Sequence, residues 1–511
     1  MLRSLVRNVG ISALAFFVIS VVGLILVPVL IRHYGIVGFG YIMIARLFLP
    51  SGGIGLVDFG ISEVAAQTVT LGRVDDNWER VFRHLGLLAL MTLALAFTLV
   101  VPLLIFAPQL AVTVGVFETH SANFAEILRC IAALLPILFL SLICEGCLKG
   151  FENFRALRLA EVSSTLVYSF LVLVFVKEEA GFKWIVYSHI GSLVMRAVMM
   201  YLTLRHAMPS GLRFRFYFLA EDLTHLRKRS ALLFSSRFLG TLQHQLPSML
   251  IAFFVGPVGV GIYDTIARLP RFAKSVLGLL NTTLMPYAMR LDAAEDGARM
   301  KLLLKFGLTL LPAIIFPLLV AVAVVSPALL SFWIDPQFAA YGSWLALFWA
   351  LPALNTVVSF QNYVLISRNS YISANNRLTI VQIFVQLVIS LTLLSSLSQF
   401  AFIAGYIGSM AGLFFWQISL MHKEIHLSAH HFQRLVAYGI VLASVVVTTH
   451  YIDAIARLSG WVELVGVAVA FWSAIAVMTY AVFLGANERA MLVVIVRLIF
   501  QSKIHNPTVK N

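Results

Sequence analysis

The stretch Gly35-Ile-Val-Gly38-Phe-Gly40 is followed a few residues later by the tripeptide Ala45-Arg46-Leu47. The same two elements return in the second half of the chain as Gly256-Pro-Val-Gly259-Val-Gly261 and Ala267-Arg268-Leu269. Two further short matches keep the same order along the two halves: Leu135-Pro136 with Leu351-Pro352, and Ile190-Gly191-Ser192 with Ile407-Gly408-Ser409. Self-similarity in a fixed order predicts that the chain contains two copies of one structural unit.

The composition places both copies in a membrane. Of the 511 residues, 60% are hydrophobic and 12% are charged, which is too apolar for a soluble globular protein and typical of a polytopic membrane protein. A spanning helix needs roughly 20 apolar residues, and windows of this length predict about fourteen spans, centred near residues 21, 51, 95, 137, 168, 194, 242, 275, 315, 353, 387, 411, 443 and 472. We therefore expect an all-α polytopic membrane protein.

The spans divide into two six-helix lobes and an additional pair. An even number of spans between equivalent positions makes the two repeats parallel, and parallel repeats place binding sites where they meet. The predicted divisions are an N-terminal lobe at 1–205, a cytoplasmic amphipathic linker at 206–230, a C-terminal lobe at 231–422, two extra helices at 435–484 and a cytoplasmic tail at 485–511.

The formal charge of +14 reports the orientation of the chain in the membrane. Most Lys and Arg residues lie in the loops on the side of the N-terminus, whereas the opposite loops hold Arg32, Lys177, Lys183 and Arg457. This bias predicts that both termini are cytoplasmic. Because the basic residues are divided among short loops, they do not form a nucleic-acid-binding surface.

Several cations lie inside segments that are otherwise apolar enough to cross a bilayer: Arg46, Arg129, Arg196, Arg237, Arg268, Arg271 and Lys274. A cation in mid-membrane costs about 2.5 to 3.5 kcal/mol, so such residues normally face a watery cavity or an anionic partner. An alternative interpretation is a residue at a helix end whose side chain extends to the lipid headgroups. This interpretation fits Arg129, and it is left open for Arg46.

Polar residues at helical spacing accompany these cations. In the first half the polar faces hold His189, Ser192 and Arg196 on the sixth span, Glu161, Thr165 and Tyr168 on the fifth, and Glu145 on the fourth. The candidate substrate-binding residues are Arg46, Arg196, Arg237, His244, Gln245, Arg268, Arg271, Lys274, Asn355, Asn362, Gln382 and Gln386. Arginines suit phosphate groups and amides suit sugars, so the pattern predicts a hydrophilic chamber for a glycan on a phosphorylated lipid. The alternative is that the polar side chains only join helices to one another.

Intramembrane acids are candidates for coupling transport to a proton or sodium gradient. They are Asp58, Glu145, Glu161 and Asp264. Asp264 is equally suited to pair with Arg268 one turn away, and Asp58 to cap a helix. We predict no metal site and no other cofactor, because the nearby histidines His422, His426 and His430 lack completing ligands and the cysteines lack a second CxxC pair.

The segments Pro28-Val-Leu-Ile-Arg32-His-Tyr-Gly35-Ile-Val-Gly38-Phe-Gly40-Tyr41 and Gly55-Leu-Val-Asp58-Phe-Gly60-Ile61 resemble the amino-terminal signature of bacterial polysaccharide transporters. These are the Wzx-type flippases of the multidrug/oligosaccharidyl-lipid/polysaccharide (MOP) exporter superfamily. The resemblance implies a two-lobed transporter that moves undecaprenyl-diphosphate-linked oligosaccharides outward by alternating access, for O-antigen or exopolysaccharide synthesis. It also implies membrane lipids and the polysaccharide polymerase and chain-length machinery as partners, and arginines that face a central cavity, for which Arg46, Arg237, Arg268 and Arg271 are the matching positions.

Three alternatives remain. Lipid II flippases of the same superfamily look similar, but their arginine and aspartate pattern on the first helix is missing here. A drug exporter would present acids rather than arginines to its cavity. A membrane polymerase or ligase needs catalytic groups outside the membrane, and the longest predicted periplasmic connection, 107–124, offers only Glu118 and His120. The sequence therefore favours a transporter over an enzyme.

Overall fold

A computed structural model describes residues 2–50, 60–75, 77–178, 180–208, 220–293, 297–365, 369–425, 429–450, 458, 460–486 and 488–490. These residues form helices joined by short connections, and no strand occurs among them. The predicted all-α polytopic fold is thereby confirmed. Contacts between Cα atoms divide the chain into two compact units, which are described separately.

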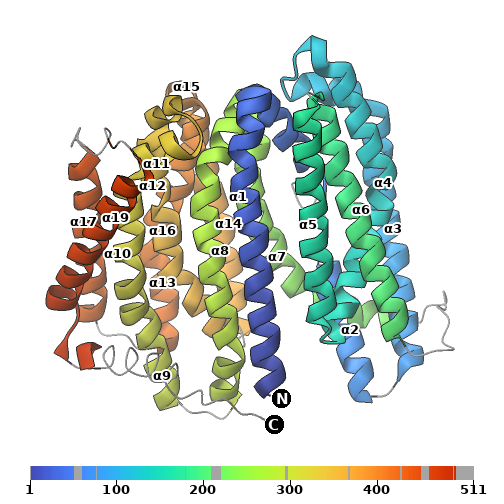
Figure 1. Ribbon diagram of the computed structural model, residues 1–511. Helices are drawn as coiled ribbons and strands as arrows, with labels where there is room; N and C mark the ends of the chain where they lie inside the picture. The colour runs from blue at the N-terminus through green and yellow to red at the C-terminus, as the bar shows by residue number, and fades with distance from the viewer. Residues whose placement is uncertain are drawn as a thin grey trace, which may run out of the picture. The chain divides into compact units, whose positions relative to one another are not determined.

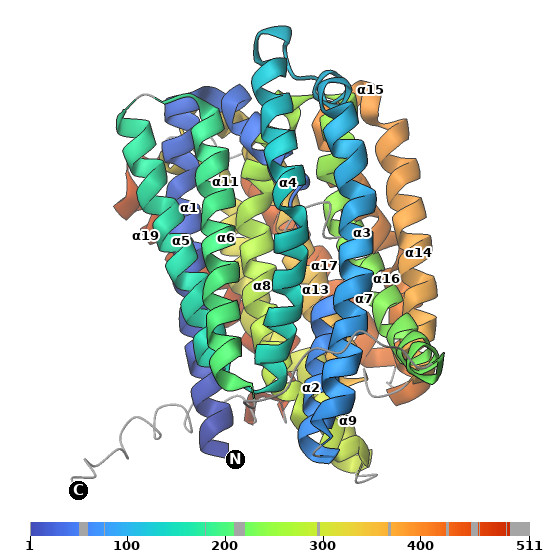
Figure 2. The ribbon, with the colours of Figure 1, turned by 90° about the vertical axis from the view of Figure 1, so that its right-hand side faces the viewer.

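Unit 1 comprises Met1–Thr265 and Asn376–Gly405. Its helices are α1 (Leu2–Leu47), α2 (Ile61–Asp75), α3 (Trp78–Thr113), α4 (Glu118–Gly150), α5 (Phe154–Lys177), α6 (Phe182–Ala207), α7 (Ala220–Phe254), the start of α8 (Pro257–Ala293), most of α14 (Asn369–Thr392), α15 (Leu394–Leu397), η4 (Ser398–Phe400) and the first turn of α16 (Ala401–Ile425). Helices α3, α4, α5 and α6 run side by side, and α1 packs against α5 (Figures 1 and 2).

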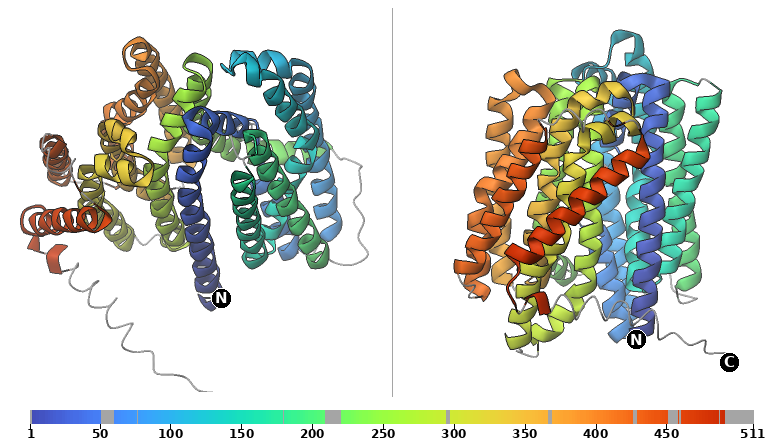
Figure 3. Two further views of the ribbon diagram at one scale, coloured as in Figure 1. Left: turned by 45° about the horizontal axis from the view of Figure 1, so that its top comes forward. Right: turned by 60° about the vertical axis from the view of Figure 1, so that its left-hand side comes forward.

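Unit 2 comprises Ile266–Asn375 and Tyr406–Asn511. It holds the rest of α8 and α16, with α9 (Gly297–Lys305), η2 (Phe306–Leu310), α10 (Leu311–Val324), α11 (Ser326–Trp333), η3 (Pro336–Tyr341), α12 (Gly342–Phe348), α13 (Ala350–Val364), α17 (Ala429–His450), α19 (Trp461–Met478) and η5 (Thr479–Phe483). Helix α10 is central, because α13, α17 and α19 all pack against it. Figure 3 shows α19 inclined over the other helices of this unit.

Ten helical segments of the described residues are long and apolar enough to cross a membrane. They are Gly10–Leu47, Trp78–Thr113, Glu118–Gly150, Phe154–Lys177, Phe182–Ala207, Leu302–Val324, Pro336–Val358, Tyr371–Thr392, Leu394–Leu420 and Trp461–Phe483. The predicted spans near residues 51, 242, 275 and 443 are not in this set. Residues 51–59 lie outside the description, α7 and α8 carry many charges, and α17 contributes a shorter apolar stretch, Val436–Val447. The predicted number of spans and the predicted lobe bounds therefore stay predictions.

The two glycine-rich stretches of the repeat contact each other within unit 1. Gly40 packs so closely on the backbone of Pro257 that a Cβ atom at Gly40 would lie 2.0 Å from the Pro257 carbonyl oxygen. Gly261 packs in the same way on Ile36, where a Cβ atom would lie 2.7 Å from the carbonyl oxygen. Because each contact is the mirror of the other in the aligned stretches, the arrangement is reciprocal, as in an isologous interface.

Glycine is also required where the chain bends. The helix α1 is broken at Gly35, whose φ of 68° and ψ of 174° are not helical. This φ lies in the region that side chains with a Cβ rarely adopt. The break separates the first predicted span from the segment that carries Arg46, so that α1 is two helices in one continuous run.

Candidate functional site

Charged side chains from four neighbouring helices of unit 1 meet in a chain of ion pairs. The guanidinium Nη2 of Arg196 on α6 lies 2.7 Å from Glu145 Oε2 on α4 and 3.3 Å from Glu161 Oε1 on α5. The ammonium of Lys149, one turn after Glu145, lies 2.8 Å from Glu145 Oε1. Arg158, one turn before Glu161, lies 2.6 Å from Glu161 Oε2.

The chain of pairs extends to the first two helices. Lys149 Nζ lies 3.8 Å from a carboxylate oxygen of Glu63 and donates a hydrogen bond of 3.0 Å to Ser62 Oγ, both at the start of α2. Arg158 Nε donates a 3.2 Å hydrogen bond to Ser12 Oγ on α1. We call this set the unit 1 ion network: Glu63, Lys149, Glu145, Arg196, Glu161 and Arg158.

The unit 1 ion network is neutral, since its carboxylates and cations alternate and are equal in number. Arg196 side-chain exposure is 24%, and that of Glu145 and Glu161 is 16% each. At this burial, ion pairs with short hydrogen bonds fix the side chains and offset much of the cost of desolvating them. Glu145 and Glu161, which the sequence marked as candidates for ion coupling, each contact two cations. Coupling at either carboxylate stays a prediction, and it requires that a proton or sodium ion displace one of these cations.

Two turns along α5 and α6 from the ion network, a second polar cluster surrounds Tyr168. Its three members come from three helices: Arg46 on α1, Tyr168 on α5 and His189 on α6. The Arg46 guanidinium carbon lies 5.3 Å from the centroid of the Tyr168 ring. The rings of Tyr168 and His189 pack edge to face, with their centroids 5.0 Å apart. Tyr168 and Glu161, like His189 and Arg196, are seven residues apart, so the two layers are separated by about 10 Å along the helices.

The Arg46–Tyr168–His189 cluster carries unused hydrogen-bonding capacity. Arg46 Nε, the Tyr168 hydroxyl and His189 Nδ1 are all buried atoms without a hydrogen-bond partner in the part of the chain that the structure describes. Tyr168 itself is only 5% exposed. Within the described residues no carboxylate pairs with Arg46, in contrast to Arg196. Buried polar atoms without partners are costly, so this cluster is suited to receive a ligand or water that accepts hydrogen bonds.

The structure thus sorts the predicted cations of unit 1 into two kinds. Arg196 is held by Glu145 and Glu161, so its predicted contact with a substrate stays a prediction. Arg46 faces an aromatic ring instead of an acid. Lys149, Arg158, Tyr168 and His189 were absent from the candidate binding set. The sequence could have revealed two of these residues by their spacing from an acid on the same helix. Lys149 follows Glu145 by four residues, and Arg158 precedes Glu161 by three.

The other candidates of unit 1 lie on α7, α8 and α14. Asp264 accepts a 3.2 Å hydrogen bond from Ser248 Oγ of α7. Gln386 is 2% exposed, and its Oε1 is buried without a hydrogen-bond partner among the described residues. Gln382 on the same helix is also buried, and His244 and Gln245 are half-buried on α7. The side chain of Arg237 and the whole of Asp58 lie outside the description.

In unit 2, Arg268, Arg271 and Lys274 follow one another at intervals of three residues on α8 and are half-buried. Asn355 on α13 turns its amide back to the carbonyl of Leu351, at 3.1 Å. The side chains of Asn362 and of the histidines at 422, 426 and 430 lie outside the description. Among the described residues there is no group of three or more His, Cys, Asp or Glu placed to hold a metal ion.

Solved structures with this fold include membrane transporters. A lipid II flippase MurJ in an inward closed conformation matches with a TM-score of 0.69 at 12% identity, covering 92% of this chain and 98% of that one. An inward-facing multidrug resistance MATE family transporter of the MOP superfamily matches with a TM-score of 0.66 at 14% identity, covering 82% and 100%. A MOP superfamily transporter from Pyrococcus furiosus gives 0.60 at 12% identity, covering 82% and 96%. At these identities the likeness concerns the fold.

No curated protein sequence matches the chain. The profile of the family described as polysaccharide biosynthesis protein matches residues 5–292, which is more than half of the chain and includes all the helices of the ion network and of the Arg46–Tyr168–His189 cluster. The family expected from the amino-terminal signature is confirmed: the chain belongs to the polysaccharide biosynthesis protein family and has the fold of MOP superfamily transporters.

Proposed function

We propose that this protein is a flippase that moves undecaprenyl-diphosphate-linked oligosaccharide repeat units across the bacterial inner membrane by alternating access. The observation that carries the proposal is Arg46, a half-buried arginine on a membrane helix with no carboxylate partner among the described residues. It occurs in a member of the polysaccharide biosynthesis protein family that has a transporter fold. A protein that carried cations would need the opposite charge at such a position.

The argument for an anionic substrate rests on charge balance. The unit 1 ion network sums to zero, so Arg46 adds a positive charge that the network does not neutralise. The Nε–H of Arg46 and the Tyr168 hydroxyl are donors without partners, and phosphate oxygens accept several hydrogen bonds at once. In this proposal Arg46 contacts a phosphate group, and the ion network holds α4, α5 and α6 in place around it.

Residues of α7, α8, α13 and α14 complete the proposed set. Arg237, Arg268, Arg271 and Lys274 provide further charge for the diphosphate, because a doubly charged group needs more than one cation. His244, Gln245, Asn355, Asn362, Gln382 and Gln386 provide the donors and acceptors that sugars require. Asp58 and Asp264 join Glu145 and Glu161 as the acids proposed to couple transport to a proton or sodium gradient.

The test uses the full-length protein in phospholipid vesicles that contain an undecaprenyl-diphosphate oligosaccharide with a fluorescent tag on its sugar. Quenching by a membrane-impermeant reductant reports which leaflet holds the tag. Arg46→Gln should slow the exchange between leaflets at least about tenfold, the loss of one charge-assisted hydrogen bond. Arg46→Lys should be intermediate, because lysine keeps the charge and loses the planar donor fork.

The matched control is Arg129→Gln, which removes an exposed arginine of α4 that the proposal does not use. It should exchange the substrate as the wild type does. If Arg46→Gln also does so, Arg46 does not bind the phosphates. A wild type that exchanges lipid II but not the oligosaccharide lipid would make it a lipid II flippase, as the similarity to MurJ allows. Altered glycan length or linkage would instead identify a polymerase or ligase, and export of a cationic drug a MATE-like exporter.

The proposal extends to orientation and partners. Both termini are proposed to be cytoplasmic, which reporter fusions at residues 1 and 511 would test. A polysaccharide polymerase and chain-length proteins are proposed partners in the membrane, and their recovery with the protein after cross-linking in cells would support this. Recovery of neither would limit the partners to the glycan lipid and the bilayer.

A further inference from the structure

Unit 1 holds two of its membrane arginines in different ways. Arg196 lies between two carboxylates, with its Nη2 2.7 Å from Glu145 and 3.3 Å from Glu161. Arg46 lies instead over the ring of Tyr168, with 5.3 Å between the guanidinium carbon and the ring centroid. This distance is within the roughly 6 Å over which an aromatic ring attracts a cation. Because no carboxylate of the described residues pairs with Arg46, the ring is the contact that these residues provide for its charge.

The two kinds of partner leave an arginine in different states. A carboxylate accepts the N–H groups of a guanidinium and cancels its charge. An aromatic ring attracts a cation through the negative charge of its face, and this attraction uses no strong hydrogen bond. An arginine held by a ring therefore keeps its charge and its N–H donors for another acceptor. Phosphate oxygens fit that requirement, because they accept two parallel N–H bonds from one guanidinium.

Tyr168 is itself held in place. Buried residues of α5 recur at intervals of four, as Ser164, Tyr168 and Val172, so the ring lies on the face of α5 that packs inside unit 1. Tyr168 is only 5% exposed. His189 of α6 packs against it with the two ring planes 67° apart, one of the arrangements that aromatic pairs prefer. The ring is therefore a fixed support for the guanidinium of Arg46.

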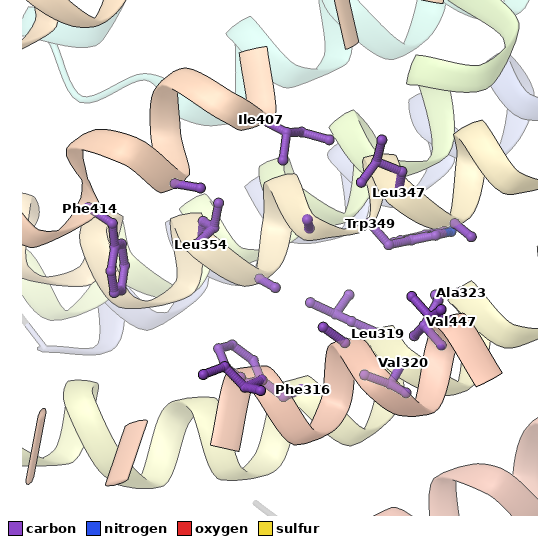
Figure 4. A pocket seen from close by; sticks show the side chains of 18 of the residues that line it. Phe316, Leu319, Val320, Ala323, Leu347, Trp349, Leu354, Ile407, Phe414 and Val447 are labelled. Atoms are coloured by element: carbon purple, nitrogen blue, oxygen red, sulfur yellow. The ribbon is translucent and has the colours of Figure 1, made fainter. Parts of the chain in front are cut away.

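Unit 2 holds an apolar cavity of about 600 Å³, but its wall offers no comparable group to a phosphate. Helices α10, α12, α13, α16 and α17 line it, and Figure 4 shows their side chains around the open space. Apart from Ser343 and Trp349, every lining residue is Gly, Ala, Val, Leu, Ile or Phe, and none is charged. A phosphate placed there would lose its water without gaining a cation. Recognition of phosphate therefore rests on cations outside this cavity, such as Arg46.

We propose that Tyr168 is a positioning residue for Arg46: its ring holds the guanidinium by a cation–π contact, so that the charge and N–H groups of Arg46 stay available to the phosphate of the substrate. This inference rests on the proposed function, in which Arg46 contacts that phosphate. The ring acts through Arg46, and the strength of their contact sets how well the protein distinguishes a phosphorylated lipid from an uncharged one. A ring that only filled space inside unit 1 would have no such effect.

The experiment changes the charge on the ring face and leaves the shape of the side chain almost unchanged. The full-length protein carries phenylalanine at position 168, in the reference variant Tyr168→Phe, or phenylalanine with one, two or three ring fluorines, introduced by suppression of a stop codon. Each fluorine draws electrons from the ring and weakens its attraction for a cation. In vesicles, two lipids with the same tagged glycan are compared, a polyprenyl diphosphate and an uncharged polyprenyl ether. The readout is the ratio of their rates of exchange between leaflets.

This ratio should fall with each fluorine, by about five-fold from the reference to the trifluorinated ring, the size of a partly buried cation–π contact. In the Arg46→Gln background the ratio should be low and independent of fluorine. The matched control is the same fluorine series at Phe170, which lies two residues along α5 and is 66% exposed, and it should leave the ratio at the wild-type level. A defect in folding would lower both rates together and leave their ratio unchanged.

The outcomes separate this inference from the proposed function. A ratio that falls in Arg46→Gln but stays constant along the fluorine series at position 168 overturns the positioning role and leaves Arg46 as the phosphate ligand. A dependence on fluorine that persists without Arg46, or that appears equally at Phe170, also overturns the positioning role. A ratio that Arg46→Gln leaves at the wild-type level overturns the proposed function, and the positioning role with it.

Discussion

Replacing Arg196 by Gln tests whether the unit 1 ion network holds the helices of unit 1 together. The substitution removes both contacts of Arg196 Nη2, at 2.7 Å to Glu145 and 3.3 Å to Glu161. The two carboxylates then remain partly buried, each with only one cation, Lys149 or Arg158. The substitution thereby removes the residue of the network that links α6 to both α4 and α5.

The expected cost follows from this geometry. A charge-assisted hydrogen bond is worth about 1.5 to 3 kcal/mol, and breaking a fully buried ion pair costs about 3 to 5 kcal/mol. Because the carboxylates keep one partner each and are 16% exposed, we expect a loss near the lower end of the second range, about 3 kcal/mol. For a protein of this size that corresponds to a fall in the unfolding midpoint of about 3 °C.

The assay is thermal unfolding of the purified protein in detergent, followed by the fraction that remains monodisperse. Arg129→Gln is the control, because it removes an arginine from the exposed face of α4 and should stay within about 0.5 kcal/mol of the wild type. The double variant Arg196→Gln with Glu145→Gln should lose less than the sum of the two single variants, since the two residues contact each other. Additive losses, or an Arg196→Gln variant as stable as the control, would refute the network.

Further predictions concern packing and single hydrogen bonds. Gly40→Ala should destabilise the protein by about 1 to 3 kcal/mol or more, because its new Cβ would lie 2.0 Å from a backbone oxygen. The control is Gly191→Ala, which has nothing within 4 Å of the new Cβ and should be neutral or stabilising. Equal unfolding midpoints for the two variants would contradict the reciprocal glycine contact. Gln361→Leu should cost about 1 to 3 kcal/mol, because it removes the donor to the Leu304 carbonyl in a fully buried position, and an unchanged midpoint would show that this carbonyl has another partner. Tyr438→Phe should lower the free energy of unfolding by about 1 kcal/mol in the same thermal assay, because it removes the hydrogen bond to the Thr479 hydroxyl. Adding Thr479→Val to this variant should cause little further loss, since both substitutions remove the same hydrogen bond.

The helical fold and several polar faces could be predicted because both follow from spacing along the chain. Seven-residue spacing placed Glu161 and Tyr168 on one face of α5, and His189 and Arg196 on one face of α6. The contact between these two faces is a finding of the structure. The partner of each cation could not be predicted, because it depends on how each helix is rotated and how close its neighbour lies. Arg196 therefore meets two acids that the sequence had assigned to a different role.

Longer-range features lay beyond sequence patterns as well. The apolar cavity arises where five helices from distant parts of the chain fail to fill the space between them, and no single segment encodes it. The glycine stretches were recognised as a repeat, but their reciprocal contact through Gly40 and Gly261 depends on how the two copies pack.

The most direct test of a phosphate-binding flippase compares the rates at which the vesicle system exchanges three lipids with the same tagged glycan: a polyprenyl diphosphate, a polyprenyl monophosphate and an uncharged polyprenyl ether. We predict that the wild type exchanges the diphosphate fastest and that Arg46→Gln loses most of this preference, because it removes a cation for which the described residues provide no acid partner. Equal rates for the diphosphate and the uncharged lipid in the wild type would contradict the account.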